Sequence, residues 1–225
     1  MRRVLVLRPE PGASATVERA RQLGLEAEAL PLFAVEPVEW AAPDPVTFDA
    51  LLLTSANAVR HGGDELRRLR GLPVHAVGEA TAAAAREAGF DLASSGDAGV
   101  ERLLASIEPD QRLLHLSGED RIDPAAARQS ITRVTVYRSH ALESPDLSGA
   151  GGSVALIHSP RAARRFSELV SDNGVVRRSI AIAAISPAAA DAAGSGWESV
   201  EAADRPADDA LLALAARLCN NPAAK

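Results

Sequence analysis

The feature that most constrains the fold of this chain is an internal duplication. Residues 50–59 (ALLLTSANAV) are matched by residues 154–163 (VALIHSPRAA), and residues 74–83 (VHAVGEATAA) by residues 182–191 (IAAISPAAAD). Each copy runs a short apolar strand into a small or hydroxylated residue that opens a helix. The repetition predicts two similar α/β lobes, and the groove between two such lobes is the natural place for a ligand.

Regular alternation of strands and helices indicates how the lobes follow one another. Strands are predicted at residues 4–7, 26–30, 50–54, 74–77, 91–93, 113–116, 132–136, 154–158, 180–185 and 199–202, with helices between them that include one capped by Ser14 and one after Asp123. Strands separated by single helices imply parallel pairing and right-handed crossovers.

Two breaks in this alternation predict the lobe boundaries. Residues 31–45 contain four prolines, and residues 149–152 are rich in glycine. We therefore expect a discontinuous first lobe of residues 1–34 and 142–225, an inserted second lobe of residues 39–137, and connectors at residues 35–38 and 138–141.

Composition and charge exclude several classes of function. An apolar content of 47%, with only 3% aromatic residues, indicates a globular core of small side chains. The net charge of −6, with one lysine at Lys225 and no basic run, argues against nucleic-acid binding. The first apolar run ends at Arg8, too early for a signal peptide or membrane span, so we expect a cytoplasmic protein with no membrane contact. No exposed apolar stripe is evident, so we expect a monomer.

No cofactor and no metal are expected. The chain has no glycine-rich phosphate loop, no Gly-x-Ser-x-Gly turn and no Cys or His pair with metal-ligand spacing. Cys219 is a lone thiol, which we interpret as a bystander. His75, His115 and His158 lie inside apolar strands, where a role in the core is the ordinary interpretation.

Small or hydroxylated residues recur where strands pass into helices. They are Ser55, Gly78, Ser117, Gly118, Ser159 and Ser186. Serine is a preferred helix N-cap, so capping alone explains each one taken singly. Together they lie at the carboxyl ends of parallel strands, where open α/β sheets bind ligands and helix N-termini bind anions. The set predicts a site for a ligand that carries several carboxylates.

Tyr137 is the other candidate for chemistry. It is the only tyrosine of the chain, and it follows a predicted strand at the start of the second connector. A tyrosine at a strand end often only covers a core, and that alternative stays open. At a connector, however, its hydroxyl could reach the ligand and donate a hydrogen bond to a leaving group.

These segments, in this order, resemble uroporphyrinogen-III synthase. The residues that carry the resemblance are VLVLRP (4–9), LEAEALPLF (25–33), FDALLLTSANAV (48–59), PVHAVGEATAAAAREAGF (73–90), LLHLSGED (113–120), VTVYR (134–138), ALIHSPRAARRF (155–166), AIAAISPAAADAA (181–193) and DDALLALAARL (208–218). Each motif by itself is only a strand and a capped helix. The ordered set, which covers nearly the whole chain, makes the resemblance specific.

The resemblance implies a fold and a reaction. The fold would be two α/β lobes, each a parallel sheet flanked by helices, with a discontinuous first lobe and a two-stranded connector. The substrate would be hydroxymethylbilane, a linear tetrapyrrole with eight carboxylates, which the family cyclises with inversion of ring D and loss of water to give uroporphyrinogen III. No cofactor is implied, and transient contact with hydroxymethylbilane synthase is a further expectation.

Site residues follow from the resemblance position by position. Tyr137 would assist departure of the substrate hydroxyl. The residues implied to line the substrate site are Thr54, Ser55, Gly78, Thr81, Ser117, Gly118, Ser159 and Ser186, with Arg8 and Arg161 as candidate carboxylate partners.

The chain departs from the family pattern at one turn. Ala188 and Ala189 stand where relatives often have a threonine, so main-chain groups or Ser186 must serve on that side. A non-catalytic two-lobed α/β binding or regulatory module for a polycarboxylate ligand is the alternative, and it would not need Tyr137 at the connector.

Overall fold

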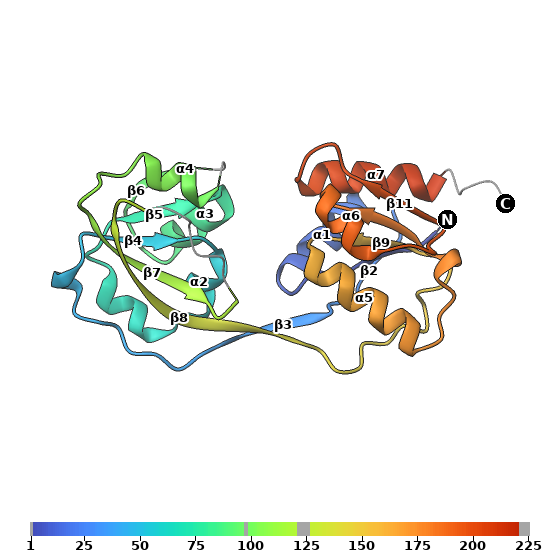
Figure 1. The fold of residues 1–225 in the computed structure, drawn as a ribbon, viewed down its shortest axis with the longest axis horizontal. Helices are drawn as coiled ribbons and strands as arrows, with labels where there is room; N and C mark the ends of the chain where they lie inside the picture. The colour runs from blue at the N-terminus through green and yellow to red at the C-terminus, as the bar shows by residue number, and fades with distance from the viewer. Residues whose placement is uncertain (1, 97–98, 121–126, 221–225) are drawn as a thin grey trace. The chain divides into compact units, whose positions relative to one another are not determined.

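The structure is a computed structural model that describes residues 2–96, 99–120 and 127–220. The chain forms two compact units (Figure 1). Unit 1 comprises residues 1–34 and 141–225, and unit 2 comprises residues 35–140. No helix of the described residues is long and apolar enough to cross a membrane.

Unit 1 is built on a parallel sheet. Among the described residues its strands lie in the order β11 (Ser199–Ala202), β10 (Ala181–Ala184), β9 (Val154–Ile157), β1 (Val4–Val6) and β2 (Ala27–Ala29). All neighbouring pairs are parallel, with Val4 opposite both Ala27 and Val154. The central strands β1, β9 and β10 are buried along their whole length, as expected for strands covered by helices on both faces.

Unit 2 contains a second sheet with the same core order. Its described strands run β3 (Phe33–Pro37), β8 (Ser130–Ala141), β7 (Arg112–Gly118), β4 (Ala50–Leu53), β5 (Val74–Val77) and β6 (Leu92–Gly96). The pairs from β8 to β6 are parallel. Without β3, the order β6-β5-β4-β7-β8 reproduces β11-β10-β9-β1-β2 of unit 1. The duplicated segments therefore occupy equivalent strands, β4 with β9 and β5 with β10.

Helices cover both faces of each sheet. In unit 1, α1 (Gly12–Gln22) and α7 (Asp208–Asn220) pack on one face, and α5 (Pro160–Asp172) and α6 (Pro187–Ala193) on the other. In unit 2, α2 (Ala56–His61) and α3 (Glu79–Glu87) pack on one face, and α4 (Val100–Ala105) on the other (Figure 1). Many of the buried contacts are alanines, so helices approach the sheets closely and strand ends are held rigidly.

Most predicted elements are confirmed, and the differences have local causes. Helix α1 begins at Gly12 rather than after Ser14, because the Glu10 carboxylate accepts hydrogen bonds from the Ser14 amide at 3.0 Å and the Ser14 hydroxyl at 2.8 Å. The prediction that Ser14 caps this helix is therefore wrong. The start of the helix predicted after Asp123 lies outside the described residues.

Candidate functional site

The carboxyl ends of β4 and β5 lead directly into helices in unit 2. Ser55 is the N-cap of α2, and its hydroxyl oxygen accepts the Asn57 amide at 3.2 Å. Gly78 precedes α3 with φ at 84°, a conformation that glycine adopts without strain. Thr81 lies in the first turn of α3 and is 4% exposed, so its side chain belongs to the packed interior.

A partly buried hydrogen bond joins the end of β4 to the middle of β7. The Thr54 hydroxyl lies 3.1 Å from Nε2 of His115, which is 2% exposed. Ser117, two residues further along β7, is equally buried, and its hydroxyl oxygen has no hydrogen-bond partner within the described part of the chain. Two of the residues singled out by sequence, Thr54 and Ser117, therefore lie at adjacent strand ends, and His115 holds the first of them.

Tyr137 lies beside Gly118. The register of β7 and β8 pairs Gly118 with Tyr137 after an irregularity at Ser117, and the Glu119 amide donates to the Tyr137 carbonyl at 3.0 Å. A Cβ atom on Gly118 would approach the Tyr137 ring to 2.6 Å and its hydroxyl to 3.0 Å. The phenol therefore lies over the Gly118 backbone, at the carboxyl end of β7.

The corresponding edge of unit 1 repeats the serine caps. The Ser159 hydroxyl oxygen accepts the Ala162 amide at 3.1 Å at the start of α5, and the Ser186 hydroxyl oxygen accepts the Ala189 amide at 3.3 Å at the start of α6. Each helix has proline as its first residue. Ala188 is exposed and Ala189 is buried, so Ser186 supplies the hydroxyl at this turn.

Arg8 belongs to a network around Asp208, the first residue of α7. The Asp208 carboxylate lies 2.9 Å from His158 Nε2, 3.2 Å from the Thr16 hydroxyl, 2.5 Å from Arg19 and 3.5 Å from Arg8. The side chain is only 15% exposed. Burial by itself raises the pKa of this carboxyl, but the His158 hydrogen bond and the Arg19, His158 and Arg8 charges together outweigh burial, so that the net pKa lies below its usual range. The carboxylate is therefore ionised near neutral pH, and it connects α7 with α1 and β9.

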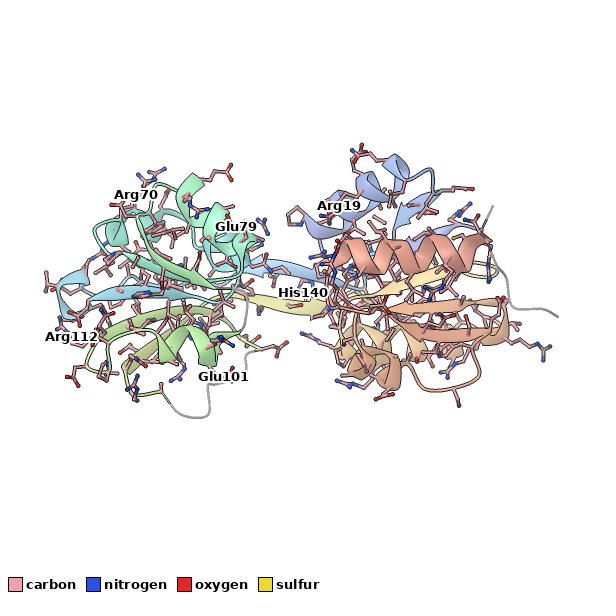
Figure 2. The ribbon with its side chains drawn as sticks, turned by 90° about the horizontal axis from the view of Figure 1, so that it is seen from above. Arg19, Arg70, Glu79, Glu101, Arg112 and His140 are labelled. Carbon is pink, nitrogen blue, oxygen red and sulfur yellow. The ribbon has the colours of Figure 1, made fainter. Side chains whose placement is uncertain are left out.

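The arginines of this unit are oriented by different kinds of neighbouring group. Arg161, in the first turn of α5, places its guanidinium 4.3 Å from the centroid of the Phe33 ring, a cation–π contact. Arg19 projects from α1 on the surface of unit 1 (Figure 2). Arg161 is thus oriented by an aromatic face, while Arg8 and Arg19 are oriented by a carboxylate.

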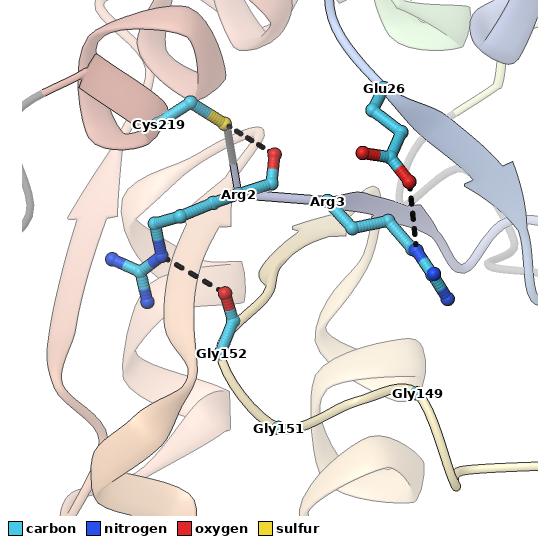
Figure 3. A pocket seen from close by; sticks show the side chains of 7 residues that line it. All are labelled: Arg2, Arg3, Glu26, Gly149, Gly151, Gly152 and Cys219. Carbon is cyan, nitrogen blue, oxygen red and sulfur yellow. Dashed lines mark hydrogen bonds and ion pairs between the residues drawn. The ribbon is translucent and has the colours of Figure 1, made fainter.

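The amino ends of β1, β2 and β9 border a separate hollow of about 620 Å³ (Figure 3). Its lining is Arg2, Arg3, Glu26, Gly149, Gly151, Gly152 and Cys219. Arg3 pairs with Glu26 at 3.5 Å, and the Cys219 thiol contacts the Arg2 carbonyl at 3.6 Å. The hollow contains none of the predicted site residues. Elsewhere in the described chain, no group of three or more His, Cys, Asp or Glu residues has the arrangement of a metal site.

Two residues near the predicted site were not found from the sequence. His61, the last residue of α2, places its ring centroid 6.3 Å from that of Tyr137. Asp208 opens α7 and holds Arg8. His61 lies outside the quoted motifs and Asp208 lies within residues 208–218, but both act through contacts with residues distant in the sequence. The DD pair that opens residues 208–218 was a signal for a helix start, and nothing in it identified a partner for Arg8.

Comparisons with known proteins agree on one family. A family model described as uroporphyrinogen-III synthase HemD matches residues 14–213. The structure of uroporphyrinogen-III synthetase from Helicobacter pylori 26695 is similar, with a TM-score of 0.66 and 19% identity over 97% of this chain and 100% of that one. A mutant uroporphyrinogen III synthase from the extremely thermophilic bacterium Thermus thermophilus has a TM-score of 0.50 and 19% identity over 98% and 100%. A search of curated proteins gave no significant match.

Proposed function

The chain belongs to the uroporphyrinogen-III synthase family, and we propose that Tyr137 and the carboxyl edges of the two sheets carry out the reaction of this family. The enzyme is a cyclising hydro-lyase of tetrapyrrole biosynthesis. It closes hydroxymethylbilane, with loss of water and inversion of ring D, to uroporphyrinogen III. The observation that carries this function is the family match over residues 14–213. The comparisons give no support to a non-catalytic binding or regulatory module.

The chemical problem is one of steering. When the bilane hydroxyl leaves as water, the remaining azafulvene is electrophilic, and in free solution it closes to the uninverted isomer. The enzyme has to hold the chain so that the substituted carbon of ring D attacks first. The resulting spiro intermediate then reopens and recloses with ring D inverted. Positioning of this kind contributes several kcal/mol without a dedicated base.

Tyr137 is proposed to help the hydroxyl leave. The phenol lies over the Gly118 backbone at the carboxyl end of β7, close to the strand ends that hold Thr54 and Ser117. An O–H donor there can hydrogen-bond the departing oxygen as it takes up its proton. Because the leaving group is reactive by itself, loss of the hydroxyl lowers the rate without abolishing it.

The carboxylates of the substrate are proposed to bind at the strand ends of each unit. In unit 2 the contributing residues are Thr54, Ser55, Gly78, Thr81, Ser117 and Gly118, and in unit 1 they are Ser159 and Ser186. Helix starts favour anions through their amide groups and the helix dipole. Helices α3 and α5, the longer of these helices, offer the stronger dipoles. The burial of Thr81 and Ser117 restricts both side chains to supporting roles, at the start of α3 and the end of β7.

Arg8 and Arg161 are proposed as carboxylate partners in unit 1. The Arg8 side chain is 35% exposed while it bonds Asp208. A guanidinium has five N–H donors, so a substrate carboxylate can share it with Asp208. Arg161 is exposed at the start of α5, with its guanidinium oriented by the Phe33 ring. We further propose that the enzyme is a cytoplasmic monomer and that it contacts hydroxymethylbilane synthase transiently to receive the unstable bilane.

One assay tests this function. The purified protein is given freshly made hydroxymethylbilane, the products are oxidised, and the type I and type III isomers are separated by chromatography. Type III in excess is expected, and type I alone at the rate of a protein-free control would contradict the proposal. Tyr137→Phe is expected to lower kcat about 100-fold while type III remains the main enzymatic product. Unchanged turnover would remove Tyr137 from the mechanism.

A further inference from the structure

The surroundings of Tyr137 suggest how its phenol is held. We propose that Gly118 and His61 form a clamp that fixes the Tyr137 ring, with Gly118 acting through its missing side chain and His61 through its neighbouring imidazole ring. In the clamp both act as positioning residues through Tyr137, and the Gly118 backbone keeps its proposed place at the substrate site. This inference rests on the proposed role of Tyr137 in the reaction.

The first side of the clamp is the backbone of β7. A Cβ atom on Gly118 would lie 2.6 Å from Cε2 and 2.7 Å from Cζ of Tyr137, closer than such atoms approach in proteins. A side chain at this position would therefore displace the ring. The Glu119 amide also donates to the Tyr137 carbonyl at 3.0 Å, so the Tyr137 backbone cannot easily move away.

The second side of the clamp comes from α2. The His61 ring centroid lies 6.3 Å from that of Tyr137, with the ring planes tilted by 38°. This separation is within the range in which aromatic pairs attract one another. His61 is half-buried, and burial together with the nearby Arg60 charge lowers the pKa of its imidazole. A neutral ring is therefore present at neutral pH, and it packs against the phenol without a charge of its own.

The clamp has a functional consequence because the Tyr137 ring is otherwise only partly covered. Tyr137 packs against the edge of the apolar cluster between the sheet and helices α2 and α3, and its own side chain is half-buried. If the Tyr137 side chain were free to change its χ1 rotamer, the phenol hydroxyl would spend part of its time away from the leaving oxygen. Misplacement by about 1 Å can cost about 100-fold in rate, so a ring held on two sides keeps the donor aligned with that oxygen.

Tyr137 is the only tyrosine of the chain, so its ring can be observed alone. Protein grown with ring-¹³C-labelled tyrosine should give a single set of aromatic NMR signals. In His61→Ala and Gly118→Ala these signals are expected to shift, and kcat is expected to fall about tenfold or more with a smaller change in KM. His61→Phe, which keeps a flat ring, is expected to retain kcat within about threefold of the wild type.

Two control variants accompany these. Gly71→Ala places a Cβ where no atom lies within 4 Å, and His140→Ala removes an exposed histidine from the strand that carries Tyr137. Both are expected to leave the tyrosine signals and kcat unchanged. If Gly118→Ala does not fold, His61→Ala tests the clamp by itself. His61 is only half-buried at a helix end, so its replacement is expected to leave the fold intact.

Three outcomes would overturn the clamp. The first is His61→Ala with unchanged tyrosine signals and unchanged kcat. The second is His61→Phe with the same loss as His61→Ala, since an imidazole nitrogen would then be needed rather than a flat ring. The third is a shift of the tyrosine signals in His61→Ala and Gly118→Ala that is no larger than the shift in the two control variants. The NMR readout does not depend on turnover, so failure of the proposed role for Tyr137, seen as full activity of Tyr137→Phe, can be distinguished from failure of the clamp.

Discussion

The Asp208 network allows a quantitative prediction of stability. Asp208→Asn keeps the size of the side chain and removes its charge. The carboxylate, 15% exposed, bonds His158 at 2.9 Å, Arg19 at 2.5 Å and Thr16 at 3.2 Å. Removing one partner of a buried ionic group costs about 3–5 kcal/mol. Because this site retains some solvent contact and asparagine preserves part of the hydrogen bonding, we expect the free energy of unfolding to fall by about 2–3 kcal/mol.

The free energy of unfolding is measured by urea unfolding monitored by circular dichroism, and the two proteins are expected to have the same m-value. The neighbouring Asp209→Asn is the matched control. The Asp209 side chain is 66% exposed and pairs only with Arg205 among the described ion pairs, so its replacement is expected to lower the free energy of unfolding far less than that of Asp208. Equal effects of the two variants would refute the reasoning.

The pH dependence of the same variant gives a second check. The pKa of Asp208 is lowered in the folded state from its ordinary value of 3.8, so the folded protein binds a proton at this site less readily than the unfolded chain. The stabilisation is therefore complete above pH 3.8 and is lost as the pH falls through the folded-state pKa below it. The difference in stability between the wild type and Asp208→Asn should shrink over that range. A stability difference that stays constant down to about pH 2 would contradict a lowered pKa of Asp208 in the folded protein.

Two further predictions concern the strand ends. Ser159→Ala removes the hydroxyl that accepts a hydrogen bond from the Ala162 amide, and it should lower the free energy of unfolding measured in urea by about 1 kcal/mol. Ser159→Asp should restore most of that loss. Equal stability of the Ser159→Ala and wild-type proteins would contradict the cap. Thr54→Val leaves the buried His115 Nε2 without its hydroxyl partner and should cost about 1–3 kcal/mol, whereas Thr54→Ser should be nearly neutral. Thermal unfolding would compare the two variants, and an equal loss in Thr54→Ser, which keeps the hydroxyl, would contradict the hydrogen bond as the source of the difference.

The local pattern of the chain was enough to predict most of the strands and helices, although β3 was expected only as a connector and β8 is longer than the predicted strand. Runs such as residues 50–53 and 154–157 are short, continuously apolar and followed by a polar residue, which favours a strand buried on both faces, and Ser159-Pro160 marks a helix start by capping chemistry. The duplication of these runs predicted two similar parallel sheets, and the matching strand orders confirm it. The resemblance to the family is likewise confirmed by the match over residues 14–213. The roles of the individual site residues stay predictions.

What only the tertiary structure decided is which distant residues meet. Sequence placed Arg8 and Thr54 at strand ends, because the end of a strand is a local property. It also placed Tyr137 at a strand end, and this was wrong, because β8 continues through Tyr137 to Ala141. It could not show that Arg8 shares Asp208 with His158, that Thr54 bonds His115, or that Tyr137 lies beside Gly118 and near His61. These contacts depend on strand order and on a register irregularity after Ser117, which arise from packing of the whole sheet. Short-range periodicity contains no information on such pairings, since the same alternation fits many strand orders.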